Sequence, residues 1–411
     1  MGLTMKEKQA LAREISMRYR KAGKKGKTAI LDEFVQNTGY NRKYALHLLA
    51  NWGRTELVRL AGRVVKLKAD AFKKRKAGGG RKPVYQAATI KALKLIWEFF
   101  DYMCGKRLSP FLREQMPFLN PCKEFGITKE VKAQLLAISP ATIDRKLKPE
   151  RKKLELKGRS ATRPGGLLKH QIPIRVFYAW DERKPGFFEL DTVVHDGGNA
   201  SGEFCCTLNA TDVYSGWVEL RALLNKAHRW VKEEVSLFPS QFPFPLLGID
   251  SDNGGEFINY QLKAWCDEHR VQFTRSRSYH KNDNCFVEQK NDMTVRRTVG
   301  YYRYDTLQAR DALAEVYRHL CPLLNYFYPS EKIIAKERIG ARVKKVYDKP
   351  KSPYRRLLES PDLPDTFKDE LRRRAARLNP VKQKRLVNHA LMALFELQSQ
   401  KSLAASALED V

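Results

Sequence analysis

The chain has 411 residues, of which 43% are hydrophobic and 30% are charged. That hydrophobic share is enough to bury real cores and excludes an intrinsically disordered polymer, and the length predicts two to four domains. Lys and Arg number 77 against 46 Asp and Glu, so the formal net charge is +31, which indicates a polyanionic partner.

Positive charge is concentrated at the two ends of the chain. Residues 1–150 hold 33 Lys and Arg against 13 Asp and Glu, and residues 331–411 hold 19 against 11, whereas the stretch between them is nearly balanced. This distribution fits DNA-binding arms around a catalytic core, with affinity from counterion release. The alternative is a soluble, highly charged surface, and the charge density of the first 150 residues makes it the weaker interpretation.

The seven cysteines are irregularly spaced and include no Cys-x-x-Cys. This pattern favours a reducing compartment over a disulfide framework, and no zinc is expected. The sequence has no signal peptide and no apolar run of membrane-spanning length. We therefore expect a cytoplasmic location and no membrane partner.

Residues 1–76 are predicted to form a helical DNA-binding domain. Apolar residues recur with helical spacing over 30–35 and 45–49, Gly39 suits the end of the first helix, and Asn41 can cap the second. This matches helix-turn-helix geometry, in which the second helix enters the major groove. An ordinary helical hairpin with a solvated basic face fits equally well. The DNA-reading residues would be Asn41, Arg42, Lys43 and His47.

Residues 77–83 are predicted to be a flexible, basic, glycine-rich linker. Its basic residues and those just before it suit contact with a phosphate backbone or a minor groove, namely Arg75, Lys76, Arg81 and Lys82.

A second helix-turn-helix domain is predicted over residues 84–150. A helix over 128–137 is followed by Ser139-Pro140, an N-cap and first-turn proline that strongly favour a new helix. Its outward-facing residues would be Thr142, Arg145 and Lys146. A charged connector is expected over 151–180.

From about residue 180 the apolar period changes from helical to strand-like. Strands are predicted over 186–194, 203–212 and 216–223, then a helix over 226–237, a strand over 245–250, a helix over 257–269 and a strand over 271–275. Such alternation predicts an α/β mixed sheet, here a catalytic domain over 181–330. A short basic β module and a helical region should complete the chain over 331–411. Its apolar stripe at 386–395 would pack on the domain or on another subunit.

Three carboxylates are the strongest candidates for chemistry. Asp191 ends one apolar run, Asp252 opens an Asp-Asn-Gly tripeptide after another, and Glu288 follows Asp252 after a gap of 35 residues, near the start of a predicted helix. Carboxylates suit Mg²⁺, and two such ions can clamp an in-line phosphoryl displacement. A turn role would explain Asp252 alone. Asp250 competes with it, since a continued strand would place both on one face.

The three carboxylates and their spacing, with Val-Glu-Gln-Lys-Asn at 287–291 and Lys-Asn-Asp at 281–283, resemble the DDE recombinases of the retroviral-integrase superfamily. The bacterial insertion-sequence transposases are the closer match. The resemblance implies an RNase H-like core with five strands and helices on both faces, and it selects Asp252 over Asp250. It also makes Asp191, Asp252 and Glu288 the ligands of two Mg²⁺ or Mn²⁺ ions.

Further residues receive roles from their position around these acids. The resemblance implies that the loop holding Tyr279, Lys281 and Asn282 borders the active site; an ordinary polar loop is the alternative. Asn291 could orient Glu288 or a phosphate, and His195 is either a neighbour of the metal ligands or a structural histidine. The basic residues available for DNA along the Glu288 helix are Lys290, Arg296 and Arg297.

The predicted function is that of a DDE transposase with double-stranded DNA as its partner. It would hydrolyse the ends of its element to free 3′-OH groups and join them to target DNA, as a homo-oligomer on DNA; the need for an accessory ATPase is left open. Two alternatives are a domesticated DNA-binding protein that has lost activity and a plain RNase H-type nuclease. Metal-dependent nicking of a DNA end would separate the first alternative from the transposase.

Overall fold

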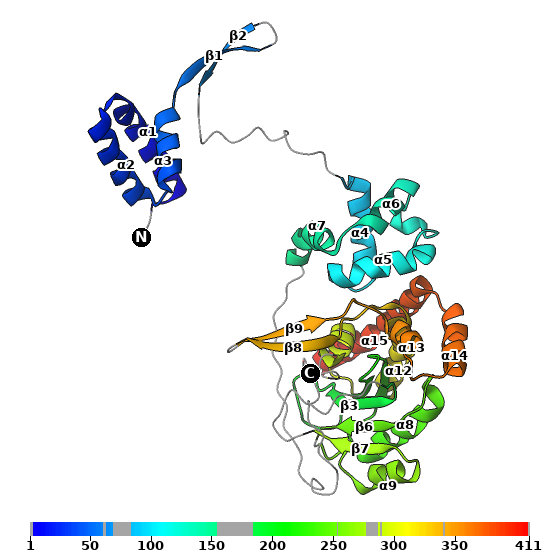
Figure 1. The fold of residues 1–411 in the computed structure, drawn as a ribbon. Helices are drawn as coiled ribbons and strands as arrows, with labels where there is room; N and C mark the ends of the chain where they lie inside the picture. Colours follow the sequence, from blue (N-terminus) through cyan, green and yellow to red (C-terminus); the bar gives the residue numbers. More distant parts are fainter. Residues whose placement is uncertain are drawn as a thin grey trace. The chain divides into compact units, whose positions relative to one another are not determined.

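The computed structural model describes residues 3–60, 63–68, 84–153, 184–252, 254–276, 287, 290–339 and 342–409. The chain forms two compact units, Met1–Val84 and Tyr85–Val411 (Figure 1). The finer division of the second unit into a DNA-binding domain, a core and a C-terminal domain stays a prediction.

The first unit is a three-helix bundle followed by a β-hairpin. Helices α1 (Met5–Lys21), α2 (Lys24–Thr38) and α3 (Arg42–Asn51) enclose a small apolar core around Phe34 and Leu48. Gly39 ends α2 with a φ of 67°, and the Asn41 side chain caps α3 by accepting the Lys43 N–H at 2.9 Å. Both helix boundaries were predicted from these residues. The hairpin of β1 (Thr55–Leu60) and β2 (Arg63–Lys68) was not predicted.

The second unit begins with α4 (Ala87–Phe99), α5 (Gly105–Leu119), the 3₁₀ turn η1 (Lys123–Phe125), α6 (Lys129–Ala137) and α7 (Pro140–Lys153). Ser139 caps α7 by accepting the Thr142 N–H at 3.3 Å, as predicted. The start of α5 packs so tightly on α7 that a Cβ at Gly105 would lie 2.2 Å from the Pro140 carbonyl oxygen. Only glycine fits there, and its N–H donates to Asp144 Oδ1 at 2.7 Å.

The catalytic-core sheet has five strands: β3 (Phe187–Val194), β4 (Cys206–Asp212), β5 (Val218–Leu223), β6 (Gly248–Ser251) and β7 (Gln272–Arg275). Their order is β5-β4-β3-β6-β7; β3, β4 and β5 pair antiparallel, and β6 is parallel to both β3 and β7. Three antiparallel strands extended by two parallel ones are the RNase H-like arrangement, so the fold prediction is confirmed.

The two faces of this sheet differ in chemistry. Phe188 of β3 stacks on Phe242, which follows α8 (His228–Gln241), at a centroid distance of 4.2 Å. This face is apolar, and α9 (Tyr260–Glu268) packs beside α8. The residues that alternate with these along each strand point to the other face of the sheet. Polar residues are concentrated on this second face, where Thr207 Oγ1 lies 2.5 Å from the hydroxyl of Tyr317 on α12 (Leu307–Pro322).

The segments around the polar face complete the unit. They are the π-helical turn η3 (Asn291–Arg296), α11 (Arg297–Val299), a second π-helical turn η4 (Leu323–Phe327) after α12, the hairpin β8 (Ile333–Ile339) and β9 (Arg342–Tyr347), and helices α13 (Pro353–Glu359), α14 (Asp365–Ala376) and α15 (Pro380–Glu409). The short basic strand module was predicted. In the apolar stripe at 386–395, Val387 and Leu394 are fully buried, and α15 packs on α12. The stripe therefore packs on its own unit.

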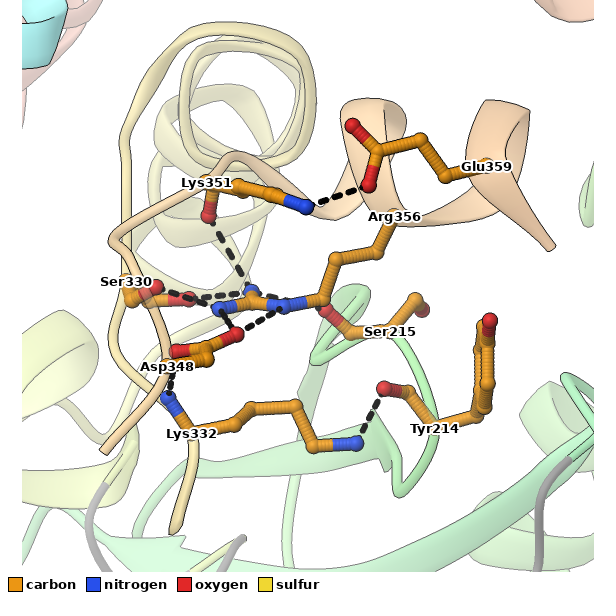
Figure 2. Close-up of polar contacts among 8 residues, drawn as sticks. All are labelled: Tyr214, Ser215, Ser330, Lys332, Asp348, Lys351, Arg356 and Glu359. Carbon is orange, nitrogen blue, oxygen red and sulfur yellow. Dashed lines mark hydrogen bonds and ion pairs between the residues drawn. The ribbon is translucent and has the colours of Figure 1, made fainter. Parts of the chain in front are cut away.

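Arg356 of α13 ties the base of the β8–β9 hairpin to the core (Figure 2). Its guanidinium donates to Asp348 Oδ2 at 3.0 Å, to the Ser215 carbonyl at 3.3 Å and to both the hydroxyl and the carbonyl of Ser330. Asp348 also accepts the Lys332 N–H at 2.7 Å. Because Arg356 is only 6% exposed, removing Asp348 would leave a buried guanidinium charge without its ion-pair partner, a change that costs about 3–5 kcal/mol.

The helices α4–α7 share one continuous apolar core with the sheet unit. Tyr328 packs its ring against Phe111 and donates its hydroxyl proton to Asp101 Oδ2 at 2.7 Å. Lys384 of α15 pairs with the same carboxylate at 2.6 Å. The predicted second DNA-binding module is thus joined to the five-stranded sheet region by direct contacts.

Candidate active site

Asp191 lies within β3, and Asp252 directly follows the adjacent parallel strand β6. Each comes one residue after the register pair of Leu190 on β3 and Ser251 on β6. Asp191 Oδ1 accepts the Thr192 N–H at 2.8 Å. Asp252 Oδ1 accepts the Gly254 N–H at 2.9 Å, which is the turn contact expected of Asp-Asn-Gly. The turn role of Asp252 and its place beside Asp191 are therefore compatible.

Both carboxylates have raised pKa values. Burial, together with the nearby charge of Asp252, raises the pKa of Asp191 to about 7, against the opposing hydrogen bonds from Thr192 and Asn291. Burial is also the main cause of the raised pKa of Asp252, to which the charge of Glu256 adds. Two carboxylates that lie close together and are poorly solvated provide the anionic oxygen ligands that a hard divalent cation prefers.

The complete ligand set is not visible. Glu288, the third predicted ligand, lies outside the described residues, and among those described no three His, Cys, Asp or Glu side chains come together as a metal site. The metal-binding role of the triad therefore stays a prediction.

Asp250 occupies a different environment from Asp252. It lies within β6, is 2% exposed, and accepts a hydrogen bond from the Thr274 hydroxyl on β7. Its register partner on β3 is Glu189, not Asp191. Of the two aspartates, Asp252 is the one positioned beside Asp191.

Asn291 contacts Asp191 directly. Its Nδ2 donates to Asp191 Oδ2 at 2.6 Å, and its Oδ1 accepts from Asn209 Nδ2 on β4 at 2.7 Å. The sequence predicts that Asn291 orients Glu288 or a phosphate, and it gives no role to Asn209. Asn209 could have been recognised as a candidate because it lies in a strand whose residues are all buried, and a buried amide needs a hydrogen-bond partner.

Glu256 and Lys226 form a charged pair next to Asp252 and were also missed. Glu256 Oε1 accepts from Thr192 Oγ1 at 3.0 Å and lies 3.4 Å from Lys226 Nζ. A Cβ at Gly254 would lie 2.5 Å from Glu256 Oε2 and 2.9 Å from Asp252 Oδ1. Glycine at 254 therefore lets the two acids approach each other.

His195 is a buried, uncharged residue. Its Nε2 lies 2.7 Å from Thr207 Oγ1, its ring packs edge-on against Tyr304, and burial lowers its pKa to about 3. Of the two interpretations, these contacts favour the structural one.

The basic residues assigned to the Glu288 helix differ in exposure. Lys290 is half-buried, and burial together with the charges of Arg107 and Arg356 lowers its pKa to about 7. Arg296 lies over the Tyr301 ring at 4.9 Å, and Arg297 is exposed and pairs with Asp292 at 3.1 Å. Arg297 is therefore the most accessible of the three to DNA.

The residues assigned to the recognition helices lie at helix starts or on exposed faces. Arg145 and Lys146 are exposed on α7, while Thr142 is half-buried and accepts from Ser139 Oγ. On α3, Arg42 pairs with Asp32, Lys43 is exposed, and His47 contacts Asn51. The remaining predicted site residues lie outside the described part of the chain: Arg75, Lys76, Arg81, Lys82, Tyr279, Lys281 and Asn282.

An RNase H-like sheet with one aspartate within β3 and a second directly after the neighbouring strand β6 defines an integrase-type core. In agreement, residues 181–281 match the family model described as Integrase core domain. An uncharacterized protein of Sinorhizobium fredii, y4rM, is 35% identical over 356 residues, which cover 86% of this chain and 96% of the relative. The chain therefore belongs to the same family as y4rM, and its residues 181–281 are an integrase core domain.

Among solved structures, the catalytic core domain of BIV integrase aligns with 20% identity and a TM-score of 0.28, over 43% of this chain and 95% of that one. The strand order β5-β4-β3-β6-β7 identifies the RNase H-like fold. No helix in the described part of the chain combines the length and apolar character needed to cross a membrane.

Proposed function

We propose that this protein is a DDE transposase that cleaves the DNA ends of its mobile element and joins them to target DNA. The observation that carries the proposal is the placement of Asp191, within β3, beside Asp252, which directly follows β6. A nuclease core accompanied by two helix-turn-helix modules and a net charge of +31 fits an enzyme that selects its DNA before cutting it.

Asp191, Asp252 and Glu288 would hold two Mg²⁺ or Mn²⁺ ions. When bound, such ions lower the pKa of a coordinated water and stabilise charge on a phosphoryl group. The chain's own contribution is to hold the carboxylates in place. Asn291 and the Thr192 N–H orient the two oxygens of Asp191, and the Gly254 N–H orients Asp252. Such preorganisation is a main source of catalysis in phosphoryl transfer.

Two in-line displacements follow at the same site. In the first, a water oxygen attacks the phosphorus at the element end, and the bond to the 3′ oxygen breaks, leaving a 3′-OH. In the second, that 3′ oxygen attacks a target phosphorus and displaces the target's own 3′ oxygen. Positioning of the two DNA segments, rather than a covalent enzyme intermediate, provides the rate.

The DNA partners would be bound outside the core. The α2–α3 and α6–α7 pairs are proposed to read the element ends, with Arg145 and Lys146 on the exposed face of α7. Basic residues elsewhere would contact phosphates and make affinity strongly dependent on salt.

The test uses the full chain, Mg²⁺ or Mn²⁺, and labelled duplexes carrying the inverted repeats that flank the gene. We expect metal-dependent nicking at the repeat end and covalent joining to a second duplex, and neither product with the Asp191→Asn variant. Specific binding without nicking would favour a domesticated DNA-binding protein. Equal nicking of repeat and random duplexes would favour a plain nuclease.

A further inference from the structure

Two polar contacts attach the polar face of the sheet to the segment that contains Glu288. The Val287 N–H donates to Glu189 Oε2 at 2.7 Å, and Asn291 Nδ2 donates to Asp191 Oδ2 at 2.6 Å. Val287 precedes Glu288 by one residue and Asn291 follows it by three. The third predicted ligand is therefore bracketed in sequence by two attachments to β3.

The spacing of these contacts suits a helical segment that runs along β3. Glu189 and Asp191 are two residues apart on one strand, so both point to the same face of the sheet. Val287 and Asn291 are four residues apart, the spacing that places two residues on one side of a helix. Each contact alone would leave the segment free to pivot, whereas two contacts also determine its direction.

Glu189 is an unusual residue for its position. It is fully buried, and its register partners are Asp250 on β6 and Thr211 on β4. Two acids side by side in the interior cost stability that an apolar pair would not. In return, a carboxylate forms a short, charge-assisted hydrogen bond to a backbone N–H, which a hydrocarbon side chain cannot do.

We propose that Glu189 is a positioning residue that, by accepting the Val287 N–H, fixes Val287 on β3 and with it the approach of Asn291 to Asp191. Asn209 assists by holding Asn291 on the Asp191 carboxylate. This assignment rests on the proposed function, because it takes Asp191 as a metal ligand of the active site.

The first test replaces the carboxylate without changing much volume. Glu189→Met removes the acceptor, and Glu189→Gln keeps an acceptor oxygen. Leu190→Val, on the apolar face of β3, is the matched control for a general loss of packing. Hydrogen exchange in the full chain without DNA or metal should be at least tenfold faster in the peptide spanning 287–299 of Glu189→Met. Exchange in β4 and β7 should be unchanged.

The second readout is metal binding and chemistry. Calorimetric titration with Mn²⁺ should show at least tenfold weaker binding to Glu189→Met, with end cleavage at least 100-fold slower and DNA affinity unchanged. Glu189→Gln should recover to within about fivefold of the wild type. Wild-type exchange and Mn²⁺ affinity in Glu189→Met, or equal defects in the Gln and Met variants, would overturn the proposal.

Two further features keep the test decisive. If Glu189→Met does not fold, Val287→Pro provides a second variant, which removes the N–H donor and leaves Glu189 in place. We expect faster hydrogen exchange over 290–299 and weaker Mn²⁺ binding in this variant. Wild-type values of both would overturn the proposal. If the wild-type protein shows no end cleavage, the proposed function fails. The exchange data still decide whether Glu189 holds the segment, because they require no activity.

Discussion

Asp191 and Asn291 are 100 residues apart in sequence, yet Asn291 Nδ2 donates to Asp191 Oδ2 at 2.6 Å. This hydrogen bond joins the first strand of the core sheet to the π-helical turn η3. Departures from regular α-helix of this kind are frequent at functional sites, where they re-aim side chains. In this protein the π-helical turn begins at Asn291. The Asn291 side chain orients Asp191, a proposed metal ligand, and also contacts Asn209 on β4.

Asp252 and Asp250 should differ sharply when changed to asparagine. Asp252→Asn should lower end cleavage and strand transfer by at least about 1000-fold, because a neutral amide is a poor substitute for an anionic ligand of Mg²⁺. Asp250→Asn should stay within about tenfold, since an amide oxygen can still accept from Thr274. Single-turnover cleavage assays and gel shifts measure both effects, and DNA binding should change by no more than a few-fold. An inactive Asp250→Asn beside an active Asp252→Asn would contradict the assignment.

Asn209 and Asn291 should act as one unit. Asn291→Ala removes the donor to Asp191 and leaves Asn209 without its partner, so we expect a loss of roughly 1–3 kcal/mol in the free energy of unfolding. A double-mutant cycle with Asn209→Ala should give a coupling energy of about 0.5–3 kcal/mol. Urea unfolding of the four proteins measures it. Additive effects would show that the Asn209–Asn291 contact contributes nothing.

Arg145 and Lys146 should control recognition of the element ends. Replacing each with Ala should weaken binding of the full chain to its inverted repeat by roughly 1–3 kcal/mol per lost base contact. If they contact only phosphate, the salt dependence of binding should become shallower instead. Arg372→Ala, at an exposed site on α14, is the control. Competition gel shifts at several salt concentrations decide between these outcomes, and unchanged binding by the double variant would remove α7 from the interface.

His195 should make the protein sensitive to acid. Its pKa is lowered to about 3 by burial, whereas the unfolded chain takes up the proton near pH 6.5. The unfolded state therefore binds more protons between these values, and the free energy of unfolding falls with pH by about 1.4 kcal/mol per unit below pH 6.5.

The His195→Gln variant should lack this contribution. Relative to the wild type, its free energy of unfolding should rise by roughly 2–3 kcal/mol as the pH falls from 6.5 to 4.5. Urea titrations across this range measure the difference, with His269→Gln, a change at a partly exposed ring, as the control. Parallel pH profiles for the wild type and His195→Gln would contradict the prediction.

The active complex should hold at least two protomers on two DNA ends, because one active site acts at one end and insertion joins both. The stripe at 386–395 is used inside its own unit, so the contact between protomers must involve other surfaces or DNA alone. Native mass spectrometry of the full chain with paired end oligonucleotides measures the stoichiometry. A catalytically competent complex with a single protomer would contradict this expectation.

The sequence by itself determined the local elements and the class of the protein. Gly39 and Asn41 mark the boundary between α2 and α3, and Ser139-Pro140 marks the start of α7, because caps act within one helical turn. Alternation of apolar residues predicted the strands, and the family resemblance of the three acids and their neighbouring motifs implied an integrase-type core. One local pattern was missed: the β1–β2 hairpin lies in a segment interpreted as wholly helical.

Only the tertiary structure decided which polar groups meet. That Asn291 contacts Asp191, that Glu189 accepts the Val287 N–H, and that Glu256 lies beside Asp252 depend on how η3 and its neighbours pack on the polar face of β3. Sequence patterns report which side of a strand or helix a residue occupies, within a few residues of the chain. They do not report which residue, 64 to 100 positions away, supplies the partner that burial makes necessary.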